Sequence, residues 1–221
     1  MANRVIVIDG PAGAGKSTVA KGLARKLDVA FMDTGAMYRA LTLKALRHKV
    51  SFEDEAGLVK LAHETHIDLV NDPGRPLKVL LDGEDVSEAI RTIEVTNNTF
   101  YVARTPDVRH VMVAWQRQMG SKRPMVGDGR DLGTVVFPDA QFKFYLDADF
   151  KVRCQRRIDE MKAKGQSVDE PALMQDLADR DQKDFSRKVG PLKKADDAII
   201  IDSTNMTIDE VIETLYQRVK Q

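Results

Sequence analysis

Short runs of apolar, often β-branched residues alternate along the chain with longer segments in which apolar positions recur with a helical period. Such runs predict buried strands, and the segments between them predict amphipathic helices. The strands are expected at residues 4–8, 29–33, 125–128, 142–146 and 198–202. Because strands that alternate with helices are joined by right-handed crossovers, the pattern predicts an α/β fold whose five-stranded parallel sheet is covered by helices on both faces.

Several helices are defined by apolar stripes and by their first residues. One stripe comprises Ala20, Leu23, Ala24 and Leu27, and another comprises Val108, Val111, Met112, Trp115 and Met119. Thr105 as an N-cap and Pro106 at the first helical position indicate where the second of these helices begins. The last helix is expected to start with a capping box at residues 207–210 and to bury Ile208, Val211, Ile212 and Leu215.

Two regions depart from this alternation. Residues 67–70 and 77–81 are short apolar runs around a turn-rich segment that contains Pro73 and Gly74, and they predict a small antiparallel insertion. Residues 151–164 are rich in charge and end at Gly165, which is typical of a helix C-terminus. From its pattern alone, this second segment also fits an ordinary solvated helix face.

The composition narrows the class of protein. A chain of 221 residues, 43% of them hydrophobic, can bury a core and suits one domain with insertions. Lys plus Arg and Asp plus Glu both number 34, so the charge balance does not favour a generic nucleic-acid or membrane surface. The single cysteine, Cys154, fits a reducing compartment. No run approaches the roughly 20 apolar residues of a membrane span, and we expect a cytoplasmic protein.

The first predicted strand runs directly into residues 10–18, GPAGAGKST. This segment fits the Gly-x-x-x-x-Gly-Lys-Ser pattern of a phosphate-binding loop, and it has the required strand before it and helix after it. Its glycines allow backbone N–H groups to turn toward phosphate oxygens at the positive end of the helix. Lys16 would reach the β- and γ-phosphates and Ser17 would bind Mg²⁺, so the segment predicts a nucleoside triphosphate site.

The phosphate-binding loop does not reveal which group accepts the phosphoryl. The sequence contains no guanine-reading Asn-Lys-x-Asp segment, which argues against a GTPase. Polar clusters instead follow predicted strands or lie in a segment that could fold over their ends, at residues 33–39, 127–134 and 180–187. Because open α/β sheets bind ligands at the carboxyl ends of their strands, these clusters are candidates for the acceptor site.

The same clusters carry a specific resemblance. The sequence resembles the bacterial cytidylate kinases over essentially its whole length, in the segments GPAGAGKST, DTGAMYRA, LLDGEDVSEAIR, GDGRDLGTVVFPDA, RDQKDFSR and IIDST. The resemblance implies a P-loop nucleoside monophosphate kinase that uses ATP and Mg²⁺ to convert CMP and dCMP into CDP and dCDP in pyrimidine nucleotide metabolism. It also implies a monomer that acts on small molecules, without nucleic-acid or membrane partners.

The family pattern further implies how the single kinase domain, residues 1–221, is divided. The core would comprise residues 1–33, 106–150 and 171–221, with an acceptor-binding lobe at 34–105 and a helical lid at 151–170. One position departs from the pattern, because Phe100 stands where a serine that contacts the base is expected. If that alignment holds, one polar contact with the base is missing or comes from a neighbour such as Thr99.

The resemblance also assigns roles to individual residues. Catalytic roles fall to Lys16, Asp128, Arg130 and Arg187, and the metal would be held by Ser17 and Asp128. Contacts with ATP are expected from Gly10, Pro11, Ala12, Gly13, Ala14, Gly15, Lys16, Ser17, Thr18, Arg153, Arg157 and Ser203. Contacts with the monophosphate are expected from Thr34, Arg39, Arg109, Arg130, Asp131, Arg180, Asp184 and Arg187. Within that set, Arg109 and Asp131 would face the cytosine edge, while Thr34, Arg39 and Arg130 would bind the acceptor phosphate.

Two other functions stay open on the sequence. One is a P-loop kinase for a different small acceptor, which a screen of acceptors would separate from a CMP kinase. The other is a nucleotide-binding switch without turnover, and the intact Lys16, Ser17 and arginine set argue against it.

Overall fold

The structure of the protein is a computed structural model that describes residues 5–72, 75–163 and 165–220. Its centre is a five-stranded sheet of order β2-β6-β1-β7-β8, in which all neighbouring strands are parallel. The strands are β1 (Val5–Asp9), β2 (Ala30–Asp33), β6 (Met125–Gly129), β7 (Phe142–Asp147) and β8 (Ile199–Asp202). The strands expected from the apolar runs are confirmed, and Arg4, the expected first residue, lies outside the described residues.

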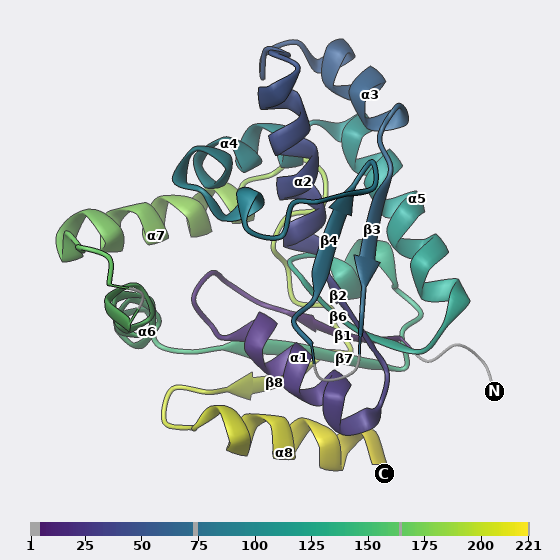
Figure 1. Cartoon of the computed structure of the whole chain (residues 1–221). Helices are drawn as coiled ribbons and strands as arrows, with labels where there is room; N and C mark the ends of the chain where they lie inside the picture. Colours follow the sequence, from purple (N-terminus) through teal and green to yellow (C-terminus); the bar gives the residue numbers. More distant parts are fainter. Residues whose placement is uncertain (1–4, 73–74, 164, 221) are drawn as a thin grey trace.

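Side chains that alternate along the strands explain why helices cover both faces of the sheet. Ile6 and Ile8 of β1 pack in one apolar cluster, whereas Val7 between them packs in another. The covering helices are α1 (Lys16–Leu27) and α8 (Ile208–Lys220) on the first face, and α2 (Thr34–Arg47) and α5 (Pro106–Lys122) on the other (Figure 1). Burial on both faces makes the central strand β1 an almost continuous apolar run, whereas the edge strand β8 leaves Ile199 and Ile200 exposed.

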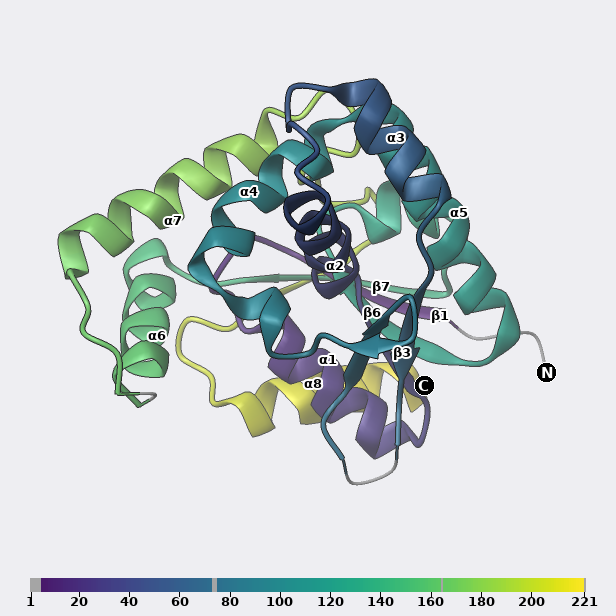
Figure 2. The same cartoon turned by 45° about the horizontal axis from the view of Figure 1, so that its top comes forward.

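A smaller set of elements is inserted between β2 and β6. After α2 come α3 (Glu55–His63), β3 (Ile67–Val70), β4 (Lys78–Leu81), β5 (Glu84–Asp85), the 3₁₀ turn η1 (Ala89–Arg91) and α4 (Ile93–Arg104). The expected antiparallel insertion is confirmed, and β5 adds a short strand that was not expected. The turn residues Pro73 and Gly74 lie outside the described residues. Figure 2 shows the β3–β4 hairpin extending from the body of the protein, and Asn71 Oδ1 accepts a hydrogen bond from Phe31 N of β2 at 2.9 Å.

Two helices form an arm at the left of Figures 1 and 2. They are α6 (Phe150–Ala163), which follows β7, and α7 (Glu170–Phe185). The helix end expected at Gly165 is confirmed, since α6 stops at Ala163 and Gly165 has a left-handed φ of +71°. Between β6 and β7 lies the π-helical turn η2 (Leu132–Val136). Because the sheet is parallel, the carboxyl ends of β1, β2 and β6 lie at the same edge of the sheet. The arm begins at this edge, since α6 follows the carboxyl end of β7.

Two local predictions at helix starts need correction. Ile208 is 50% exposed, because the buried stripe of α8 begins one turn later, at Val211. Thr105 occupies the N-cap position of α5, but its hydroxyl donates to Tyr101 O at 3.0 Å and caps nothing. The capping box of α8 is confirmed by the hydrogen bond from the Thr207 N–H to the Glu210 carboxylate at 2.8 Å.

Candidate active site

Residues 10–15 form a tight loop between β1 and α1, at the carboxyl edge of the sheet, and residues 16–18 begin α1. Gly13 and Gly15 have left-handed φ values of +76° and +86°, and Gly10 has a φ of +151°. A β-carbon at Gly10 would overlap Leu146 O of β7, so no other residue fits there. The loop ends at the N-terminus of α1, where the helix dipole and free N–H groups stabilise an anion.

Lys16 and Ser17, the first residues of α1, lie beside the end of β6. Lys16 is buried and its Nζ donates to a carbonyl of the loop at 2.6 Å, while Ser17 Oγ donates to Asp128 Oδ2 at 2.9 Å. Burial and the positive charge of Arg130 lower the pKa of Lys16 well below its usual value. Burial and the negative charge of Asp33 raise the pKa of Asp128 to about 7. Lys16 therefore lacks sufficient negative charge nearby, and Asp128 lacks sufficient positive charge. Bound phosphate and a bound cation would supply these charges.

Arginines from four segments lie close enough to affect one another electrostatically: Arg39 of α2, Arg130 after β6, Arg157 of α6 and Arg180 of α7. Arg180 is exposed, but the surrounding protein removes part of its hydration. This desolvation, together with the positive charges of Arg130 and Arg39, lowers the pKa of Arg180 to about 10. Burial also lowers the pKa of Arg39. Within the described ranges, neither Arg39 nor Arg180 has a carboxylate at ion-pair distance. This excess of positive charge suits a phosphate group.

Two other predicted residues take part in pairs near this cluster. Asp184 Oδ2 accepts from Arg130 Nε at 2.7 Å, and its Oδ1 lies 3.5 Å from Arg187 Nη2. Burial opposes the charge on Asp184, but Arg130 and Arg187 outweigh burial and hold its pKa below the usual value. Thr34, at the start of α2, donates from Oγ1 to Asp128 O at 2.7 Å and so joins α2 to β6.

The two residues expected to read the base lie together. Arg109 of α5 and Asp131 after β6 form an ion pair in which the side chains are 2% and 9% exposed. The Arg109 guanidinium also lies 5.6 Å from the centroid of the Tyr38 ring. A β-carbon at Gly190, which has a φ of +58°, would overlap both charged groups of the pair. The pair is thus enclosed by protein, with each charge neutralised by the other.

Arginines of the expected lid differ in their surroundings. Arg153 Nη1 donates to Asp181 Oδ2 at 2.6 Å and to Ala12 O at 2.7 Å, so its guanidinium contacts the phosphate-binding loop. Arg157 is paired with Glu160 at 2.6 Å and is 42% exposed.

The predicted adenine-side residue Ser203 is also engaged by the arm. Arg156 Nη1 donates to Ser203 Oγ at 3.0 Å, and that hydroxyl donates in turn to Asp147 O at 3.0 Å. These bonds tie α6 to the loop after β8.

Sequence reasoning missed Asp9 and gave no role to Asp181. Asp9 accepts hydrogen bonds from Leu132 N at 3.0 Å and Gly133 N at 2.7 Å, and so holds the turn that begins after Asp131. Burial, only partly offset by these hydrogen bonds, raises the pKa of Asp9 to about 6. A carboxylate that ends an otherwise apolar strand was the available signal, because such a group requires buried partners.

Phe100, the departure from the family pattern, lies on α4 and faces the arm. Its ring is 5.8 Å from that of Tyr101 and 5.5 Å from Lys183 Nζ of α7. The Thr99 hydroxyl donates to Val95 O of its own helix at 2.6 Å. Thr99 therefore has its own partner here, and whether it substitutes for the expected serine stays a prediction.

The residues at the loop fit a magnesium nucleotide. Asp128 Oδ1 is buried and accepts no hydrogen bond from the described residues, while Oδ2 is bonded to Ser17. A carboxylate and a hydroxyl are ligands that Mg²⁺ prefers, and it usually completes its shell with water and phosphate oxygens. In the described part of the chain, no group of three or more His, Cys, Asp or Glu residues could hold a metal ion by itself.

Comparison with known proteins decides the family. A model of the family described as cytidylate kinase matches residues 6–221. The chain belongs to the cytidylate kinase family. The cytidylate kinase of Desulforamulus reducens is 49% identical over 219 residues, which cover 99% of this chain and 98% of that protein. The cytidylate kinase of Anoxybacillus flavithermus is 50% identical over 210 residues, or 95% and 93% of the two chains.

This cytidylate kinase family member is a phosphotransferase, and its reaction is the ATP-dependent phosphorylation of CMP and dCMP in pyrimidine nucleotide metabolism. The family implies ATP as co-substrate and usually Mg²⁺. A crystal structure of an uncharacterized protein from Eubacterium ventriosum aligns over 99% of both chains with a TM-score of 0.54 and 14% identity, which supports the fold alone. No helix within residues 5–72, 75–163 and 165–220 is long and apolar enough to cross a membrane.

Proposed function

We propose that this protein transfers the γ-phosphoryl group of Mg²⁺-bound ATP to CMP or dCMP at the carboxyl edge of its parallel sheet. The observation that carries the proposal is the cytidylate kinase match over residues 6–221. The protein acts as a cytoplasmic monomer of one kinase domain, with a core at 1–33, 106–150 and 171–221. The acceptor lobe is 34–105 and the lid is 151–170.

On the donor side, residues 10–18 hold the triphosphate through backbone N–H groups. Lys16 compensates the charge that moves onto the β- and γ-oxygens, and Ser17 and Asp128 hold the metal. The depressed pKa of Lys16 and the raised pKa of Asp128 support this assignment, because bound phosphate and cation would restore each charge. When bound, Mg²⁺ supplies charge neutralisation on the transferring phosphoryl group.

On the acceptor side, Arg39, Arg130 and Thr34 bind the phosphate of the monophosphate, and Arg187 joins them near the reacting group. Arg180 and Asp184 contact the sugar, and Arg109 and Asp131 contact the cytosine edge. The unneutralised charge around Arg39 supports the phosphate assignment. Enclosure of Arg109 and Asp131 supports the base assignment, since hydrogen-bond readout discriminates best where water is excluded.

Phosphoryl transfer needs little covalent help from the protein. Its charge is spread over several oxygens in the transition state, so positioned cations and N–H groups provide most of the acceleration. Arg157 of the lid and Ser203 beside the adenine complete the nucleotide site. The exposed position of Arg157 suits a lid group that reaches ATP when the arm closes.

The test is an ADP-release assay over CMP, dCMP, UMP, AMP and shikimate with Mg·ATP. We expect turnover with CMP and dCMP, and a preference for another acceptor would reassign the substrate. Lys16→Ala provides the control and should lose about a hundredfold or more in rate, equivalent to about 3 kcal/mol of transition-state stabilisation. Circular dichroism would verify its fold, and turnover of the folded variant within a few-fold of wild type would contradict the P-loop assignment.

A further inference from the structure

Ala12, at the tip of the phosphate-binding loop, is held on both of its backbone polar groups. Its N–H donates to Asp181 Oδ1 at 3.0 Å, and its carbonyl accepts from Arg153 Nη1 at 2.7 Å. The same Nη1 donates to Asp181 Oδ2 at 2.6 Å. Arg153 and Asp181 are 7% and 8% exposed, so the closed ring of contacts lies away from water. One residue of the loop is therefore joined to both helices of the arm, α6 and α7.

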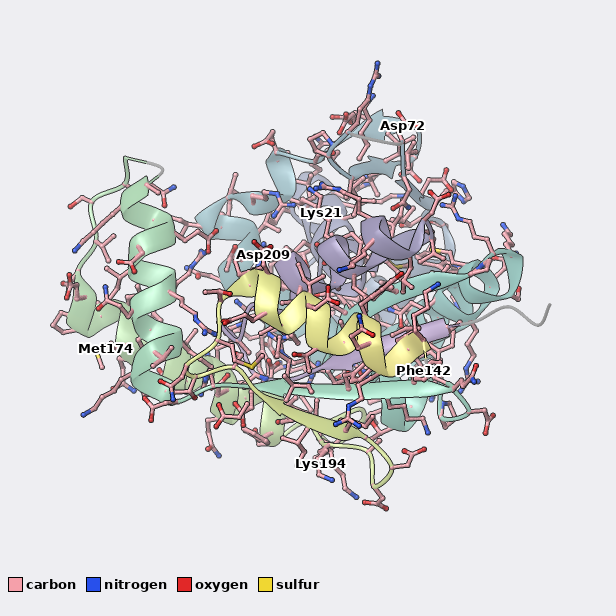
Figure 3. All side chains as sticks on the ribbon, turned by 90° about the horizontal axis from the view of Figure 1, so that it is seen from below. Lys21, Asp72, Phe142, Met174, Lys194 and Asp209 are labelled. Carbon is pink, nitrogen blue, oxygen red and sulfur yellow. The ribbon has the colours of Figure 1, made fainter. Side chains whose placement is uncertain are left out.

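Apolar packing surrounds this ring. Ala12 clusters with Cys154 of α6 and Leu177 of α7, and Phe150 and Met174 pack against them. Figure 3 labels Met174 on the arm, well to the side of α8.

The next loop residue is equally constrained. A β-carbon at Gly13 would lie 3.1 Å from Arg153 O and 3.2 Å from Arg153 Cβ, closer than most β-carbons approach. Consequently the loop cannot shift at Ala12 and Gly13 without moving the root of α6.

We propose that Arg153 and Asp181 are positioning residues that fix the conformation of the phosphate-binding loop for ATP. They act through Ala12 and do not touch the nucleotide. This inference rests on the proposed function, and it gives the arm a second task besides carrying Arg157. Because the ring joins the loop to the root of both arm helices, the arm and the loop change conformation together.

The surroundings of the two side chains favour positioning over direct contact. The Arg153 guanidinium is already committed to Ala12, Asp181 and, through Nε at 3.2 Å, to Ala148 O. Arg157, one turn further along α6, has a side chain that is 42% exposed, and its positive charge helps to lower the pKa values of Arg39 and Arg180. Asp181 would repel a triphosphate if its charge were not neutralised, and Arg153 neutralises it.

The test uses the full chain with Asp181→Asn and Arg153→Met, singly and together. Isothermal calorimetry with ATP and Mg²⁺ measures the Kd without turnover, and steady-state assays give KM for ATP and for CMP separately. Each single variant should bind ATP about tenfold more weakly, with KM for CMP unchanged within about twofold. The double variant should be no worse than either single variant, because all three changes break the same ring.

Asp181→Asn separates positioning from electrostatics. If Arg153 touched ATP directly, removal of a nearby negative charge would leave ATP binding unchanged or tighter. If the pair positions the loop, the same substitution weakens binding, because the amide has one acceptor oxygen where the ring needs two and turns its NH2 donor toward either the guanidinium or the Ala12 N–H. Unchanged or tighter ATP binding by Asp181→Asn would therefore overturn the proposal. Matched controls are Asp176→Asn and Lys151→Met, which remove the same charges from exposed positions of α7 and α6.

Two further measurements keep the outcome decisive. Amide hydrogen exchange at Ala12 in the unliganded protein should accelerate in Asp181→Asn and stay unchanged in Asp176→Asn. This readout does not depend on the acceptor, so a wild type that fails to phosphorylate CMP would refute the proposed function but leave this test intact. If Asp181→Asn does not fold, Arg153→Lys replaces it and should show an intermediate loss of ATP affinity, since lysine keeps the charge without the planar fork. Wild-type protection and ATP affinity in Arg153→Lys would overturn the inference.

Discussion

The two ends of the proposed acceptor site differ in whether their charged side chains are neutralised by other side chains. At the base end, Arg109 and Asp131 are buried against each other, and each charge has its partner within the protein. At the phosphate end, Arg130 is paired with Asp184, whereas Arg39 and the neighbouring Arg180 have no carboxylate at ion-pair distance among the described residues, and the pKa values of Arg39 and Arg180 are lowered. The two charges at the base end therefore neutralise each other without a ligand, whereas the phosphate end holds arginines that no carboxylate neutralises. Loss of one partner from the buried pair would leave an uncompensated charge inside the fold, whereas the unneutralised arginines favour affinity for an anionic substrate.

The largest expected difference between the two ends is in the free energy of unfolding after an arginine is removed. Arg109→Ala should lower the free energy of unfolding by about 3 to 5 kcal/mol, because it leaves the buried Asp131 charge unpaired. Arg39→Ala should change it by less than about 0.5 kcal/mol or raise it, because a like charge leaves the cluster. Urea unfolding of both variants measures the difference. Equal losses would mean that the two ends are built alike.

The second test of the comparison is the selectivity for cytosine over uracil at the base end. Cytosine offers an N4 donor to Asp131 and acceptors to Arg109, whereas uracil would place O4 against the carboxylate. The wild type should prefer CMP over UMP in kcat/KM by at least about a hundredfold, or roughly 2.7 kcal/mol. Asp131→Asn should narrow that gap, because an amide presents either a donor or an acceptor, and should leave KM for ATP unchanged. Equal use of CMP and UMP by the wild type would withdraw the base-reading roles while leaving the kinase assignment in place.

Arg39→Ala tests the phosphate end by function. A charge-assisted contact with phosphate is worth about 1.5 to 3 kcal/mol, so KM for CMP should rise by tenfold or more. KM for ATP should change far less, because Arg39 lies on α2, in the proposed acceptor lobe. Arg47→Ala is a matched control on the same helix, since Arg47 is engaged by Glu84 at 2.7 Å. Comparable increases in both KM values would contradict the placement of Arg39 at the acceptor.

The comparison also marks how far the sequence could be interpreted. The strands, the hairpin and the phosphate-binding loop follow from local patterns, because their geometry depends on residues adjacent in the chain. Which arginine is neutralised depends on contacts between distant segments: Arg153 meets Asp181 across 28 positions and Ala12 across 141. No periodicity encodes such pairs, so a charge-rich helix looks uniform although Arg153 is buried and Arg157 is exposed. The family resemblance therefore gave Arg153 and Arg157 the same role, contact with ATP.

Asp9 offers the smallest and most specific test, because its carboxylate accepts hydrogen bonds from the turn that follows Asp131. Its folded-state pKa of about 6 lies above the ordinary value of 3.8, so the folded protein binds the proton more tightly than the unfolded chain. This contribution to stability is fully present at low pH and is lost as pH rises from about 4 to about 6, at up to about 1.4 kcal/mol per pH unit. Asp9→Asn has no such proton, so the unfolding free energy of the wild type minus that of the variant should fall across this window and level off above it. Urea unfolding at a series of pH values measures the difference, and subtraction removes the titration of all other groups that behave alike in both proteins. A difference that stayed flat or rose with pH would show that the two hydrogen bonds from residues 132 and 133 stabilise the carboxylate more than burial disfavours it.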